Sequence, residues 1–103
     1  MRYQLVIQFP GDSLTDYDRL VSVEARLTAA LADVAEVDGH DVGSGEANIF
    51  VLTEDPTGAF ALALPVLKEC VAIGGMRAAF RDVGGEAYTV IWPQQFRGTF
   101  ALA

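Results

Sequence analysis

Residues 37–53 read VDGHDVGSGEANIFVLT, and this stretch decides the fold. Its second half, residues 46–53, is rich in β-branched and aromatic side chains, which favour a strand. Its first part, residues 37–42, has a weaker strand pattern that a glycine interrupts. Glycines at positions 43 and 45 allow the tight turn of a hairpin between the two. The stretch therefore predicts two adjacent antiparallel strands in the middle of the chain.

Helical periodicity precedes this hairpin. Ser13 and Asp16 resemble a capping box, which predicts a helix from about Leu14 to about Asp33. Polar side chains of this segment lie largely away from its apolar stripe. The residues of that stripe are Tyr17, Leu20, Val21, Leu27, Leu31 and Val34.

A second helical segment follows the hairpin. Asp55 can cap its first turn, and Pro56 occupies the position where proline is tolerated. The segment should end at Gly74-Gly75, and Pro65 inside it predicts a kink or a late start. Its apolar positions are Phe60, Ala63, Leu64, Leu67 and Val71.

Three further strands complete the pattern. Residues 2–9 alternate in polarity, and residues 76–83 and 86–92 flank Gly84-Gly85, which suits a two-residue hairpin turn. The resulting order is βαββαβ plus a final strand, an α+β ferredoxin-like sandwich with both helices on one face of an antiparallel sheet. Strand 37–42 should lie at one edge and the final strand at the other.

We expect residues 1–93 to form a single domain, and residues 94–103 to be a C-terminal tail, docked or disordered.

Composition excludes several function classes. The net charge of −7 and the pI near 4.4 disfavour binding to nucleic acids and to anionic membranes. No apolar run approaches the roughly 18 residues of a membrane span, and the first residues show no signal segment. The lone Cys70 fits a reducing compartment, so we expect a cytoplasmic protein with either a core cysteine or a reactive thiol.

The negative charge is concentrated in the first half of the chain. Residues 27–67 contain no Lys or Arg. The acids in that span are Asp33, Glu36, Asp38, Asp41, Glu46, Glu54 and Asp55. Such a cluster could dock a basic protein partner, with association that weakens as salt rises. It could equally provide solubility and protect an edge strand from aggregation.

His40 is the only histidine, and it lies close in sequence to Asp38 and Asp41. An imidazole beside carboxylates could transfer protons, which makes these three residues the catalytic candidates. The same group could hold a divalent metal, but a zinc site usually draws two or more His or Cys ligands, so we predict no metal. No motif in the chain predicts a cofactor. A polar turn histidine without a chemical role is the competing interpretation.

Asn48 places a polar amide in the strand 46–53. This is unusual, because a buried amide must find hydrogen-bond partners. With polar residues of other strands it could form a strip on the helix-free face of the sheet, for a ligand or partner. The binding candidates are Gln4, Gln8, Glu36, Glu46, Asn48 and Thr89. These side chains could also be the solvent-exposed face of a sheet that is covered on one side only.

The side chains of Tyr88, Val90 and Trp92 should share one face of their strand. They could belong to the core or form the wall of a pocket.

Residues 38–50, together with Phe9-Pro10-Gly11-Asp12 and Glu54-Asp55-Pro56, resemble a set of small acidic bacterial proteins that have no established activity. The resemblance covers most of the chain. It implies no catalytic residue, and the ferredoxin-like architecture itself hosts enzymes, sensors and interaction modules alike.

Two functional hypotheses follow from these observations. The first is a non-catalytic binding or interaction module with an acidic hairpin. This module could form a homodimer through its sheet face or through an edge strand. The alternative is a small enzyme or ligand sensor that uses His40 with a neighbouring carboxylate.

Overall fold

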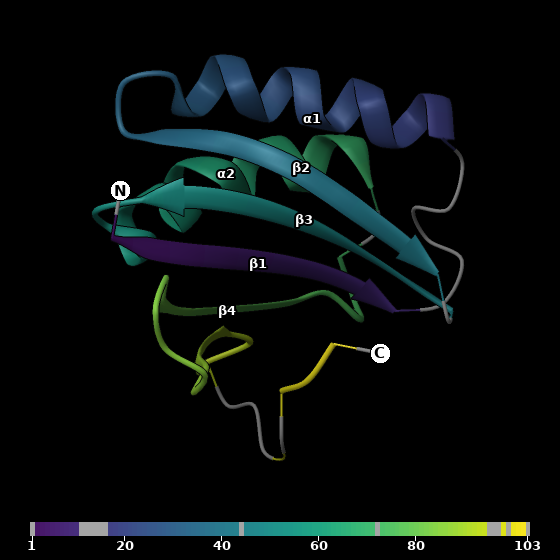
Figure 1. Cartoon of the computed structure of the whole chain (residues 1–103). Coiled ribbons are helices and arrows are strands. Elements are labelled where there is room, and N and C mark those ends of the chain that lie inside the picture. Colours follow the sequence, from purple (N-terminus) through teal and green to yellow (C-terminus); the bar gives the residue numbers. More distant parts are fainter. Residues whose placement is uncertain are drawn as a thin grey trace.

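The computed structural model describes residues 2–10, 17–43, 45–71, 73–94, 98 and 100–102. Five strands form one sheet in the order β2-β3-β1-β4-β5, and all pairs are antiparallel. Two helices, α1 and α2, pack together against this sheet (Figure 1). The predicted α+β sandwich and its strand order are therefore confirmed.

Strand β1 (Tyr3–Pro10) lies at the centre of the sheet, between β3 and β4. Its alternation places Leu5, Ile7 and Phe9 under the helices, where each is at most 1% exposed. Val6 and Gln8 point to the opposite face, and they are buried as well. Both faces of β1 are therefore covered, although the alternation of polar and apolar residues predicted that one face is exposed to solvent.

Helix α1 (Tyr17–Leu31) buries Leu20, Val23, Leu27 and Leu31 against the sheet. The predicted stripe was wrong at Tyr17, Val21 and Val34, whose exposed fractions are 66%, 41% and 42%. The helix ends at Leu31 rather than Asp33, where the Val34 amide donates to the Leu31 carbonyl at 2.9 Å. Its predicted start near Leu14 lies outside the described residues.

Strands β2 (Ala35–Gly43) and β3 (Glu46–Thr53) form the predicted hairpin. Gly43 pairs with Glu46, and Gly45 in the turn has a φ of 77°, which favours glycine. The register shifts between Val37 and Gly39, and Gly39 itself has a φ of 140°. The interruption in the sequence is thus a β-bulge in the edge strand, which increases local twist.

Helix α2 (Pro56–Cys70) starts where Asp55 and Pro56 predicted. The Asp55 carboxylate accepts a hydrogen bond from the Gly58 amide at 3.1 Å. This bond satisfies one of the first-turn N–H groups that have no acceptor within the helix. The helix continues through the exposed Pro65, so no late start occurs. It ends at Cys70, before the predicted stop at the double glycine.

Strands β4 (Arg77–Asp82) and β5 (Thr89–Trp92) are joined by residues 83–88. The predicted two-residue hairpin was therefore wrong. The Gly85 amide closes a β-turn to the Asp82 carbonyl at 2.8 Å, and the chain then runs on to Thr89. An irregularity in the β4–β5 pairing sets Trp92 beside the helices and Val90 on the opposite face. The expectation that Tyr88, Val90 and Trp92 share one face was wrong for that reason.

Thr53 links β3 to the turn after α1, and its side chain is fully buried. Its hydroxyl donates to the Val34 carbonyl at 2.9 Å and accepts from the Asp55 amide at 3.1 Å. We expect Thr53→Val, which keeps the shape, to lower the free energy of unfolding by about 1–3 kcal/mol, because the Val34 carbonyl and the Asp55 amide each lose a partly buried hydrogen bond. Urea unfolding measures this, with exposed Thr28→Val as the control. Equal losses in the two variants would contradict it.

Candidate functional site

Strand β2 is the outer strand on one side of the sheet and pairs only with β3 among the described strands. Its three carboxylates, Glu36, Asp38 and Asp41, are exposed, and we name them the acidic edge. Residues 40–43 beyond the bulge are also exposed. An edge strand presents backbone N–H and C=O groups that no neighbour uses. The acidic edge therefore combines negative charge with a backbone able to pair with another strand.

His40 points from β2 toward α1, not toward its sequence neighbours. Its Nδ1 lies 2.7 Å from the Oε1 atom of Glu24, and its ring centroid lies 6.0 Å from that of Tyr17. Only 28% of the His40 side chain and 16% of the Glu24 side chain are exposed, so the pair is partly shielded from solvent.

The predicted partners of His40, Asp38 and Asp41, are not the ones that the structure brings to it. Asp41 pairs with Asn48, one position from the His40–Ile49 pair, so its side chain points to the other face of the sheet. Asp38 lies in the bulge. Glu24 was missed because its helix comes much earlier in the chain, and only the packing of α1 on the sheet brings it to β2.

Two members of the predicted polar strip, Gln8 and Asn48, are buried. Gln8 and Asn48 are each 2% exposed, and both donate to the Oε2 atom of Glu46, at 3.2 Å and 2.9 Å. Gln8 also donates to the carbonyl of Ala101 at 3.0 Å. The Oδ1 atom of Asn48 is buried without a hydrogen-bond partner among the protein atoms described. These amides therefore make their hydrogen bonds within the protein, and Gln8 ties β1 to the C-terminal segment.

Two other members of that strip have different surroundings. Gln4 accepts from the guanidinium of Arg81 at 3.0 Å on the helix-free face. Thr89 is exposed and pairs with Phe80, whereas Val90 contacts the side chains of the helix-free face. Thr89 therefore does not join the other candidates, because β5 presents it to the opposite side.

The C-terminal segment, residues 100–102, covers the helix-free face. Phe100 is 7% exposed and packs on Val6 and Ala79. Phe50, Tyr88 and Val90 surround this second cluster, and the rings of Tyr88 and Phe100 lie 5.1 Å apart. Figure 1 shows this segment, in yellow, running below the sheet beside β4. The part of this face that lies over β1 and β4, which the sequence left open for a partner, is thus covered by the chain itself.

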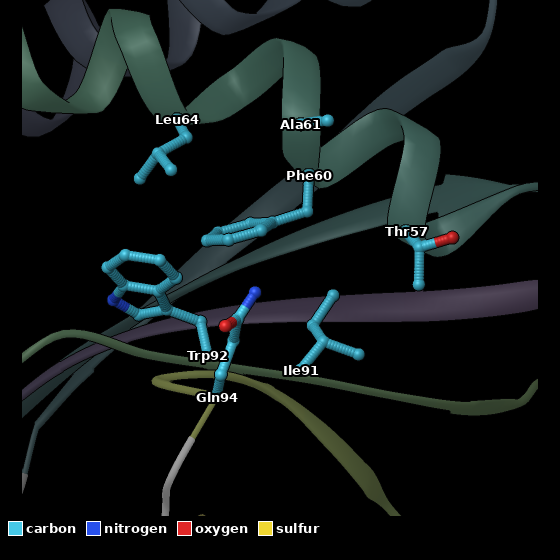
Figure 2. A pocket seen from close by; sticks show the side chains of 7 residues that line it. All are labelled: Thr57, Phe60, Ala61, Leu64, Ile91, Trp92 and Gln94. Atoms are coloured by element: carbon cyan, nitrogen blue, oxygen red, sulfur yellow. The ribbon is translucent and has the colours of Figure 1, made fainter.

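A cavity of about 280 Å³ lies between α2 and β5, at the opposite edge of the sheet from β2. Figure 2 shows Phe60 and Leu64 extending from α2 toward Trp92 below them. The lining residues are Thr57, Phe60, Ala61, Leu64, Ile91, Trp92 and Gln94. The sequence had offered Trp92 as part of a pocket wall, together with Tyr88 and Val90, which do not line this cavity. The wall from α2 was not indicated, because the two walls come from segments about thirty residues apart that meet only in the folded chain.

Cys70 is half-buried at the end of α2, and its Sγ lies 2.9 Å from Nη1 of Arg26. The same guanidinium donates to the Glu69 carboxylate at 2.5 Å, and this hydrogen bond raises the pKa of Arg26.

In the part of the chain that the structure describes, no three His, Cys, Asp or Glu side chains gather as a metal site. Neither described helix has the length and apolar character needed to span a membrane.

Comparison of the chain with protein-family models, curated proteins and solved structures gave no match. The resemblance based on residues 38–50 is therefore supported only at the level of the fold.

Proposed function

We propose that this protein is an interaction module that takes a basic, extended segment of a partner protein along β2. The observation that carries the proposal is a nine-residue outer strand with three exposed carboxylates, within a span of 41 residues that has no Lys or Arg. Backbone pairing supplies affinity in this mode of recognition, and side-chain chemistry supplies selectivity. Negative charge along the strand selects a positively charged partner.

The bulge defines which part of β2 would accept the partner. Extra twist at Asp38 and Gly39 bends the strand away from regular pairing. Beyond the bulge, residues 40–43 are exposed and continue in regular register with β3. A short basic strand added here would bring its cations near Asp41, which is the closest regular carboxylate.

A second copy of the chain fits this edge less well than a basic partner. Antiparallel pairing of two β2 strands would bring the same acids face to face, and like charges across strands are destabilising. Light scattering at low and high salt measures the solution mass, and we expect no dimer through β2 at low salt.

The catalytic alternative lacks comparable support, because His40 lies at the β2 edge and the described cavity lies at the β5 edge.

The proposal is tested with a labelled synthetic peptide that alternates Lys and Val. We expect its fluorescence anisotropy to rise on binding, and the affinity to fall at least about tenfold when salt increases from about 0.05 M to about 0.5 M, because exposed charges are screened. Asp41→Lys should weaken binding at low salt. Glu86→Lys makes the same change in net charge at an exposed position near β5, and it should have a smaller effect.

A second peptide separates strand pairing from simple charge attraction. It carries the same number of Lys residues but replaces each Val with Pro, which cannot donate a backbone hydrogen bond. If both peptides bind alike, or if Asp41→Lys and Glu86→Lys weaken binding equally, strand addition at β2 is wrong. The carboxylates would then serve only to keep the edge from aggregating.

A further inference from the structure

We infer that the cavity between α2 and β5 binds a small, uncharged aromatic molecule. This site is separate from the acidic edge and does not depend on the proposed interaction with a basic partner. The two features lie at opposite edges of one sheet, so each can be changed without touching the other.

The lining of the cavity argues for an uncharged occupant. Five of its seven residues are apolar, and none of the seven carries a charge, although the protein has a net charge of −7. A charged group covered by these apolar walls would lose part of its hydration without an ion partner in the lining, and that loss is costly. Thr57 and Gln94 supply the polar groups. The Thr57 hydroxyl already donates to Asp55 at 3.2 Å, so toward a ligand it acts as an acceptor.

The aromatic side chains argue for a flat occupant. The rings of Phe60 and Trp92 lie 5.9 Å apart and are tilted by 47°, so they form an angled wall (Figure 2). Phe60 is 6% exposed and therefore held by the core, whereas Trp92 is half-buried. Aromatic rings favour offset or edge-on contacts with another ring. The volume of about 280 Å³ lies just below the usual range for drug-sized ligands, which favours a compact ring system.

Two local features leave this space open. The irregularity in the pairing of β4 with β5 directs Trp92 toward α2. On the helix, Ala61 lines the rim of the cavity next to Phe60, and its short side chain leaves space there. A substitution at this alanine can therefore block the site without altering the core residues.

The experiment uses 1-aminoanthracene, a neutral fluorescent three-ring amine, with the full chain. Trp92 is the only tryptophan, so energy transfer from tryptophan to the bound probe reports binding beside this residue. We expect saturable binding with quenching of Trp92. Anthracene-1-carboxylate has the same rings with a negative charge, and it should bind at least about tenfold more weakly because the site offers no cation.

Two matched variants locate the binding. Ala61→Phe should abolish it by filling the cavity, whereas Leu62→Phe, at the next position of α2 and outside the lining, should leave it unchanged. Gln94→Glu changes an exposed lining residue, so folding is preserved, and its carboxylate should weaken binding of the neutral probe. Asp41→Lys should have no effect, which keeps this test independent of the β2 proposal.

Three results would overturn the inference. The probe could fail to bind, or it could bind equally to wild type, Ala61→Phe and Gln94→Glu, which would mean adsorption elsewhere. Alternatively, wild type could be a dimer that excludes the probe and that Ala61→Phe converts to a monomer. In that case the cavity would accept a side chain of a second copy rather than a small molecule.

Discussion

Leu27→Ala is expected to lower the free energy of unfolding by about 2–5 kcal/mol. Leu27 is fully buried in the cluster between α1 and the sheet, and the shorter side chain leaves a cavity that its neighbours fill only in part. Urea unfolding followed by circular dichroism measures the loss. Because α1 also carries Glu24, which contacts His40, a shift of the helix should change the environment of the imidazole as well.

The matched control is Leu62→Ala on α2. Leu62 is 49% exposed, so the same chemical change should cost no more than about 0.5 kcal/mol. Helix propensity changes equally in the two variants, because both replace Leu by Ala inside a helix. Similar losses at both positions would mean that α1 does not pack as described.

Phe100→Ala is expected to lower the free energy of unfolding by about 3 kcal/mol, the low end of the range for a buried phenylalanine. The ring is 7% exposed and covers Val6 and Ala79 on the helix-free face. The low end applies because a short C-terminal segment can relax around the missing ring. We also expect the variant to bind a dye for exposed apolar surface more strongly, since it uncovers a patch that the wild type buries.

Leu102→Ala provides the control for Phe100. It lies two residues further along the same segment and is 37% exposed, so its effect should be small. If both variants unfold at the same urea concentration as wild type, the C-terminal segment does not stabilise the domain. The helix-free face would then be open to a partner, as the sequence first suggested.

The sequence indicated the elements because each element has a local physical cause. Alternation in residues 2–9 requires a strand with two distinct faces, and the Asp55-Pro56 pair supplies the cap and first turn of a helix. The strand order follows from handedness and from the short connections. Acidic residues at an outer strand could be predicted in the same way, because the hairpin position and the missing Lys and Arg are both visible in the chain.

Tertiary structure decided which faces and which partners these elements meet. His40 contacts Glu24 because α1 packs beside β2, and the sequence holds no sign of which helical carboxylate will be closest. Gln8 is buried where its amide donates to the Ala101 carbonyl of the returning C-terminal segment, and Asn48 is buried beside it with Glu46 as their shared acceptor, although their polar character predicted solvent. The cavity exists because an irregularity in strand pairing turns Trp92 toward α2. Local sequence determines backbone conformation through steric and capping preferences, whereas burial and long-range contacts depend on how the whole chain packs.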